Sequence, residues 1–177
     1  MSRIISILAN QSLSYPNKQD FFSPHIKYPE YKLNHISNHP NSVYDSVRHV
    51  FIQAGLDKDH FGKPNWNPLG EFIQPGSRVF VLCNFVYQRR PNEMLFDFMG
   101  KCTHGSVLRA LIDYILIATG NKGKVQFGNA PLQSANWESV LSDSGADLVA
   151  RFYQERGLPV EACDLRLFVA ERSRAGK

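Results

Sequence analysis

The sequence contains few cysteines and no long hydrophobic run, and these two absences exclude several classes of protein. Cys83, Cys102 and Cys163 are odd in number and lack C-x-x-C spacing, so we expect neither a disulfide framework nor a structural zinc site. The longest apolar run, around residues 111–118, is far shorter than a membrane span. The N-terminus carries one arginine and a very short apolar stretch, which is more typical of a first strand than of a secretory signal. We therefore expect a cytoplasmic protein without a membrane span.

Common catalytic and nucleotide-binding motifs are absent as well. The chain has no Walker A, G-x-G-x-x-G, G-x-S-x-G or H-E-x-x-H pattern. His25, His35, His39 and His60 have no metal-ligand spacing, and residues 57–59 fall short of a calcium loop. The sequence therefore predicts no metal site and specifies no cofactor.

The composition is that of an ordinary globular domain with a mild positive charge. Hydrophobic residues make up 43% of the 177 residues and charged residues 20%, which is enough for one buried core. The net charge of +4 comes in part from Arg166, Arg172, Arg174 and Lys177, so a solvated tail explains it better than nucleic-acid binding. We expect a single α/β domain over residues 1–177 that ends in a loose basic tail at 167–177.

Residues 10–42 differ in composition from the rest of the chain. Pro16, Pro24, Pro29 and Pro40 interrupt them, so no helical period survives. We expect an irregular segment that wraps over the domain and is anchored by aromatic side chains. These side chains belong to Phe21, Phe22, Tyr28 and Tyr31.

Helix and strand signals alternate along the remaining sequence. Residues 79–84, Val-Phe-Val-Leu-Cys-Asn, follow a Pro-Gly turn and predict a central strand that is buried on both faces. Further strands are expected at 3–9, at 124–127 and within 160–169, and helices at 42–54, 103–118, from Ser134 or Asn136 to Gly145, and at 146–156. The alternation predicts a three-layer α/β fold, in which a largely parallel sheet has helices on both faces and follows an irregular N-terminal segment.

Polar side chains follow the expected strands and precede the expected helices, where an open α/β sheet usually binds its ligand. The candidate ligand-binding residues are Asn84, Arg89, Thr103, Ser106, Gly128, Asn129, Gln133, Ser134, Asp164 and Arg166. His104 is the candidate catalytic residue, because a helix N-terminus lowers the pKa of an imidazole and leaves a neutral donor or base. Amide and arginine side chains together suit an anionic or carboxylate-bearing ligand.

Each candidate also has a purely structural interpretation, and both interpretations stay open at this point. Asn84 can tie down the following loop through hydrogen bonds to the backbone. His104 can be a solvated residue of the first helical turn. Asp164 and Arg166 alternate along one strand and can simply pair with each other. Arginines 89 and 90 are more often a solvated pair in a loop.

Several longer motifs lie between residues 23 and 166. They are Lys27-Tyr28-Pro29-Glu30-Tyr31, Trp66-Asn67-Pro68-Leu69-Gly70, Ile73-Gln74-Pro75-Gly76, the strand 81–86, Thr103-His104-Gly105-Ser106-Val107, Arg109-Ala110, Asp113-Tyr114, residues 128–134 and Asp164-Leu165-Arg166. On these motifs the chain resembles the N-terminal half of the domain-of-unknown-function 362 family. The family is uncharacterised, and its members often occur near bacterial surface-polysaccharide genes. The resemblance supports the α/β fold.

The diagnostic strand of that family contains Lys-Pro-Asn, whereas this chain has Leu82-Cys83-Asn84. If the family's lysine binds an anion, Arg89 or Arg90 has to replace it here. Family members are also commonly longer. We therefore keep two expectations, a relative with an active site and a truncated or inactive relative.

We therefore expect an enzyme, or an inactive relative of one, that binds a small anionic metabolite such as a sugar or nucleotide derivative at the carboxyl edge of the sheet. The resemblance implies surface-polysaccharide metabolism as the setting. The alternative is a non-catalytic interaction module that dimerises or docks a partner protein through an open sheet edge or the aromatic wrap. Nucleic-acid binding through the arginine-rich tail together with Arg89 and Arg90 is the weakest of the three.

Overall fold

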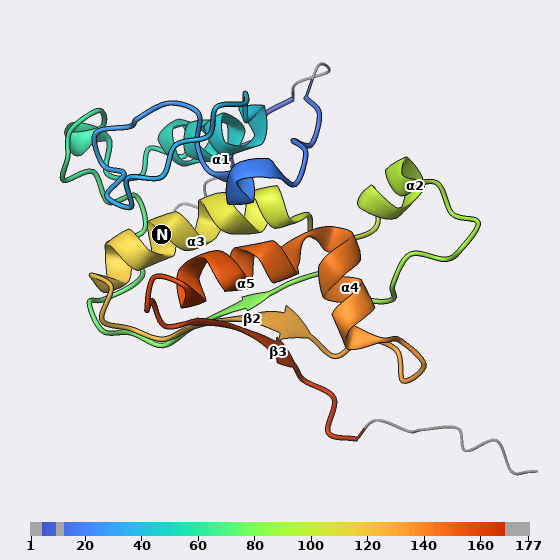
Figure 1. Ribbon diagram of the computed structural model, residues 1–177. Coiled ribbons are helices and arrows are strands. Elements are labelled where there is room, and N and C mark those ends of the chain that lie inside the picture. The colour runs from blue at the N-terminus through green and yellow to red at the C-terminus, as the bar shows by residue number, and fades with distance from the viewer. Residues whose placement is uncertain (1–4, 10–12, 169–177) are drawn as a thin grey trace, which may run out of the picture.

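The computed structural model describes residues 5–9 and 13–168, which form a parallel sheet with helices packed against it (Figure 1). The strands are β1 (Val79–Leu82), β2 (Val125–Asn129) and β3 (Val160–Asp164). The helices are α1 (Ser42–Gln53), α2 (Leu95–Met99), α3 (Gly105–Thr119), α4 (Trp137–Ser144) and α5 (Ala146–Gln154), with 3₁₀ turns η1 (Gln19–Phe22) and η2 (Lys58–His60). No helix among the described residues is long and apolar enough to cross a membrane.

The sheet has the strand order β1–β2–β3, and both neighbouring pairs run parallel. Val79 pairs with Val125, which in turn pairs with Val160. The α/β class and the parallel sheet are therefore confirmed. The central strand is β2, however, and β1 lies at an edge of the sheet, where the sequence led us to expect the centre.

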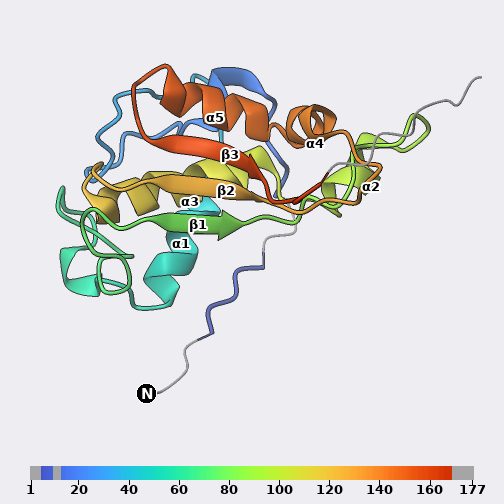
Figure 2. The same ribbon diagram turned by 90° about the horizontal axis from the view of Figure 1, so that it is seen from below.

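The helices of the described chain lie on one side of the sheet. Figure 1 shows α3 and α5 next to the strands, with α1 farther out over α3, and Figure 2 shows the opposite face uncovered. We expected helices on both faces. When strands follow one another as β1–β2–β3 and the crossovers share one hand, every crossover helix falls on the same side, and only a reversal of strand order covers the second face.

The uncovered face corrects our interpretation of β1. Cys83, which follows the strand, is 2% exposed and belongs to the main hydrophobic core with Val81 packed against it. Phe80 and Leu82 alternate with these residues and are 42% and 72% exposed. The prediction of a strand buried on both faces is therefore wrong, because an apolar run alone does not show which layers cover it.

Side-chain caps define where the helices begin. Asn41 and Asn136 cap α1 and α4 by accepting a hydrogen bond from a backbone N–H in the first turn. The cap of α3 is His104, one residue after the expected Thr103. Residues 95–99, which lie between the expected elements, form the short helix α2.

The chain ends match the expectations less well. Residues 5–9 form no strand, although we expected one at 3–9. Residues 3 and 4 and most of the expected tail, 169–177, lie outside the described residues.

A buried ion pair on α3 holds the irregular N-terminal segment. Arg109 and Asp113 are 0% and 3% exposed, and Arg109 Nε donates to Asp113 Oδ2 at 3.1 Å. The guanidinium also donates to Phe21 O at 2.9 Å and to the Tyr31 hydroxyl at 2.8 Å. Burial opposes the charge of Arg109, but the Asp113 carboxylate outweighs it and keeps the pKa of the guanidinium above its ordinary value.

The same carboxylate joins three helices. Asp113 accepts hydrogen bonds from the hydroxyl of Tyr44 on α1 at 3.0 Å and from that of Tyr153 on α5 at 2.7 Å. Phe22 and Tyr31 of the N-terminal segment are buried against this region, with 1% and 6% exposure. The prediction that aromatic residues anchor the wrap is confirmed.

A second buried ion pair fastens the wrap to α1. Arg48 Nε donates to Glu30 Oε1 at 2.7 Å, and the Tyr114 hydroxyl donates to the same oxygen at 3.0 Å. The Arg48 guanidinium lies 4.3 Å from the ring centroid of Tyr28 and 4.5 Å from that of Phe61. The N-terminal segment is therefore held by charge as well as by apolar packing.

We expect Asp113→Ala to lower the free energy of unfolding by about 3–5 kcal/mol, because Arg109 would stay buried without a counter-ion. Urea unfolding followed by circular dichroism measures the loss. The matched control is Glu155→Ala, which breaks the exposed Arg151–Glu155 pair at the same i,i+4 spacing on α5. It should cost less than about 1 kcal/mol. Equal losses in the two variants would contradict the role of the buried pair.

Candidate functional site

The carboxyl ends of the strands meet at the side of the molecule that bears α2 and α4 (Figure 1). Asn84 follows β1 there, and its backbone N–H donates to Thr103 Oγ1 while its side-chain amide donates to Lys101 O, both at 2.8 Å. The backbone N–H of Thr103 donates to Asn84 O at 3.2 Å. Asn84 and Thr103 thus tie the end of β1 to the approach to α3, in line with the structural interpretation.

Residues at the end of β2 are tied to its neighbours in the same way. The Asn129 amide donates to Cys83 O at 2.7 Å, and its side-chain oxygen accepts from the backbone N–H of Ala130 at 2.8 Å. A Cβ at Gly128 would lie 1.9 Å from Cys163 O, so only glycine fits at this point beside β3. Both predicted residues therefore maintain the sheet.

Asp164 and Arg166 form a pair at the end of β3. Arg166 Nε lies 3.0 Å from both carboxylate oxygens of Asp164, and hydrogen bonds from Arg166 lower the pKa of that carboxyl. Arg166 Nη1 also donates to the carbonyls of Leu132 at 3.1 Å, Gln133 at 3.4 Å and Ala135 at 2.9 Å. The guanidinium is therefore used in holding the loop between β2 and α4.

His104 is a buried cap at the start of α3. Its side chain is almost fully enclosed, with 2% exposure of the residue, and its ring stacks on Tyr15 at a centroid distance of 4.3 Å. Nδ1 accepts a hydrogen bond from the backbone N–H of Ser106 at 3.2 Å and lies 2.8 Å from the Ser106 hydroxyl. This burial excludes the interpretation of His104 as a solvated residue of the first helical turn.

The protonation of His104 follows from these contacts. Burial lowers its pKa to about 4, and the positive charge of Lys18 adds to the effect. The direction of the shift agrees with our expectation, although burial rather than the helix dipole is its main cause. Because a backbone N–H can only donate, Nδ1 must be the acceptor, and the neutral ring carries its proton on Nε2.

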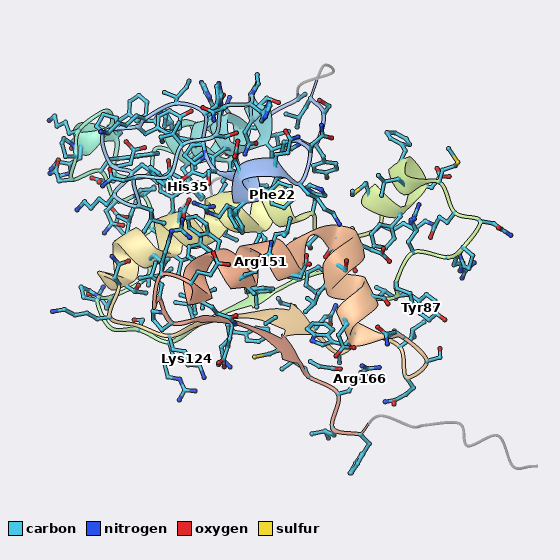
Figure 3. All side chains as sticks on the ribbon, viewed as in Figure 1. Phe22, His35, Tyr87, Lys124, Arg151 and Arg166 are labelled. Atoms are coloured by element: carbon cyan, nitrogen blue, oxygen red, sulfur yellow. The ribbon has the colours of Figure 1, made fainter. Side chains whose placement is uncertain are left out.

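A hollow of about 660 Å³ opens at the carboxyl edge of the sheet, between the chain after β1 and the loop after β2. We name it the cationic hollow. It is lined by Val86, Tyr87, Gln88, Arg89, Arg90, Pro91, Glu93, Phe98, Lys101, Leu132 and Ser134. Figure 3 shows Tyr87 and Arg166 at this end of the sheet and Lys124 at the other end.

Three positive side chains and one negative side chain line the cationic hollow. Lys101 pairs with Glu93, and this hydrogen bond is the main cause of the lowered pKa of the Glu93 carboxyl. The backbone N–H of Arg89 donates to Asp143 Oδ2 at 2.8 Å. Within the described part of the chain, the guanidinium groups of Arg89 and Arg90 have no hydrogen-bond or ion-pair partner. The uncompensated charge of the hollow is therefore positive.

A second hollow, of about 840 Å³, lies beside α2 and contains His104. We name it the apolar hollow. It is lined by Leu13, Ser14, Tyr15, Pro16, Asn17, Lys18, Arg89, Leu95, Phe96, Met99, Gly100, His104 and Asp143. The short helix α2 contributes to both hollows, with Phe98 in the cationic hollow and Leu95 in the apolar hollow, and Arg89 belongs to both.

The structure brings together only a minority of the predicted site residues. Arg89 and Ser134 line the cationic hollow, and Arg89 and His104 line the apolar hollow. The other predicted residues line neither: Asn84, Thr103, Ser106, Gly128, Asn129, Gln133, Asp164 and Arg166. Sequence reasoning missed Lys18 and Lys101, which lie in irregular segments where no periodic pattern marks their direction.

The described residues contain no cluster of three or more His, Cys, Asp or Glu side chains that could hold a metal ion. No family model, curated protein or solved structure matches the chain. The function must therefore be argued from the geometry of the two hollows.

We expect the stability of the protein to fall as the pH falls from about 6.5 to about 4, because the unfolded chain binds a proton at His104 that the folded chain does not bind. The loss is on the order of 3 kcal/mol over this interval. His104→Asn keeps a capping side chain but removes the titration, so its stability should depend less on pH. Urea unfolding at several pH values measures both slopes.

The control for this experiment is His49→Asn, which removes an exposed histidine of α1. It shows whether the replacement of any histidine changes the pH dependence. A His104→Asn variant that keeps the full pH dependence would show that another group is responsible.

Proposed function

We propose that the cationic hollow binds a small anionic metabolite, such as a sugar or nucleotide derivative. The observation that carries the proposal is the pair of guanidinium groups of Arg89 and Arg90, which lack partners in the described chain and line a hollow of about 660 Å³. Arginine binds carboxylate and phosphate groups through paired hydrogen bonds, and pockets of this size accommodate metabolites.

The position of the hollow supports the same proposal. It lies at the carboxyl edge of a parallel sheet, where α/β folds usually bind ligands. Arg89 and Arg90 follow β1 and offer the positive charge that the Leu82-Cys83 sequence lacks. A setting in surface-polysaccharide metabolism rests on the motif resemblance alone.

His104 lines the adjoining apolar hollow rather than the cationic hollow, and it restricts the chemistry that we propose for an enzyme there. Its Nδ1 is engaged as the cap of α3, so the group left for a ligand is the Nε2–H of a neutral ring. His104 would then act as a hydrogen-bond donor rather than as a base. A binding protein, or an inactive relative of an enzyme, requires no further group.

We expect a nucleotide sugar, a sugar phosphate or inorganic phosphate to raise the melting temperature of the protein. A ligand at one hundred times its Kd stabilises the fold by about 2.7 kcal/mol, a shift of roughly 5–10 °C for a domain of this size. The double variant Arg89→Gln, Arg90→Gln should weaken binding by about tenfold or more, because each arginine contributes charged hydrogen bonds to the anion. Differential scanning fluorimetry and calorimetric titration measure these effects.

The matched control is Arg78→Gln, an exposed arginine at the opposite end of β1. This variant should bind the anion as the unmodified protein does. Equal weakening in the two arginine variants would show non-specific attraction, and the absence of stabilisation by any anion of the panel would overturn the proposal.

A second candidate function is self-association through the uncovered face of the sheet. Leu82 projects from this face with 72% exposure, and Phe80 on the same face is 42% exposed. Lys124 and Glu161 add charges of both signs, with Lys124 Nζ 2.6 Å from Glu161 Oε1. An uncovered sheet face with exposed apolar side chains suits a second copy of the chain.

We expect the unmodified protein to form a dimer at high concentration and Leu82→Lys to remain a monomer, because a charge would be buried between the two sheets. Light scattering coupled to size exclusion measures the mass. Phe72→Lys is the control, since Phe72 is 67% exposed but lies outside the sheet. If the unmodified protein stays monomeric at every concentration, self-association through this face is refuted.

A further inference from the structure

The two hollows share one arginine, and their linings differ in chemistry. Arg89 lines both, so an anionic group held by Arg89 would lie at the junction. The wall that α2 gives to the apolar hollow consists of Leu95, Phe96, Met99 and Gly100, none of which has a polar side-chain atom. A ligand that fills both spaces therefore has an anionic end and an apolar end.

The apolar surface continues from this hollow onto the outside of α2. Phe96 is 87% exposed, Leu95 is 49% exposed, and Met94, just before the helix, is 71% exposed. Large apolar side chains gathered on one short element usually mark a surface that something covers. Phe98, in contrast, is 3% exposed and lines the cationic hollow. One side of α2 is therefore buried, while Met94, Leu95 and Phe96 beside it are exposed.

A long flexible chain fits this surface better than a flat base. A nucleobase needs hydrogen-bonding groups along its edge. The α2 wall offers none from its side chains, and the polar side chains of the hollow, among them Ser14, Asn17 and Asp143, come from other segments. An alkyl or prenyl chain needs only apolar contact and can follow the side chains of α2 beyond the hollow. Two further charges of opposite sign line this hollow: Lys18, whose ammonium donates to Ser142 O, and Asp143, whose carboxylate accepts from the backbone N–H of Arg89.

We propose that the ligand of this site is a phosphate monoester with one long apolar chain, whose phosphate lies between Arg89 and Arg90 and whose chain lies in the apolar hollow along α2. The inference rests on the proposed function, because it names the class of anion that the cationic hollow binds. It adds a second determinant, the chain, to the charge that the proposed function requires.

The test is a calorimetric titration with methyl, hexyl and decyl phosphate, each below the concentration at which it forms micelles. Affinity should rise with chain length by about threefold to fourfold for each methylene that becomes buried. The double variant Leu95→Asn, Phe96→Asn should remove most of this gain and leave the affinity for methyl phosphate unchanged. Its melting temperature without ligand checks that the fold is intact.

Two controls distinguish binding at this site from non-specific hydrophobic binding. Phe72→Asn removes an exposed aromatic residue away from both hollows and should keep the full dependence on chain length. Decanol has the same chain as decyl phosphate but no charge, and it should bind at least tenfold more weakly.

The outcomes separate this inference from the proposed function. Equal affinities for methyl and decyl phosphate would overturn the inference, while the proposed function would stand because the anion still binds. Binding of none of the phosphates would overturn both. Binding to vesicles that contain phosphatidic acid, without any dependence on chain length for the single-chain phosphates, would overturn the inference in favour of a membrane surface.

Discussion

The buried ion pair of Arg109 and Asp113 is the constraint on which the rest of the structure depends. A charged pair this deep is stable only if its remaining hydrogen-bonding groups are satisfied. Those groups come from separate parts of the chain: Phe21 O and the Tyr31 hydroxyl from the N-terminal segment, and the hydroxyls of Tyr44 on α1 and Tyr153 on α5. The pair therefore demands that the proline-rich wrap, α1, α3 and α5 be in place together. It also explains how a segment without helix or strand pattern obtains a fixed path.

The order of the strands determines which surfaces of the protein are open to a ligand or a partner. With β1, β2 and β3 in sequential order, the helices gather on one face, and the loops after the strands gather at one edge. The first consequence is an uncovered face with Phe80 and Leu82. The second is the pair of hollows around α2 at the carboxyl edge. Both candidate functions therefore arise from one topological fact.

The α/β class, the parallel sheet and the capped helices α1 and α4 could be predicted from the sequence because their signals are local. The exposure of Phe80 and Leu82 could not, since it depends on strand order rather than on the residues of β1. The burial of His104 depends on Tyr15 and Phe22, which are more than eighty residues away in the chain. Most of the predicted site residues do not line a hollow, and the reason is related. The sequence shows that a residue is polar, but it does not show whether its side chain is already hydrogen-bonded to a distant part of the backbone.

This difference between polar groups that bond within the protein and those that do not is the basis of the proposed site. Asn84, Asn129, Asp164 and Arg166 all lie at the carboxyl edge, yet their hydrogen bonds go to the protein itself. Arg89 and Arg90 lie at the same edge and have no such partner in the described chain. A charged group that the fold does not use keeps its full capacity for a ligand, whereas a group within the fold can bind one only by breaking a bond. The selectivity of the proposed site would therefore come from these arginines and from the apolar side chains of α2 beside them.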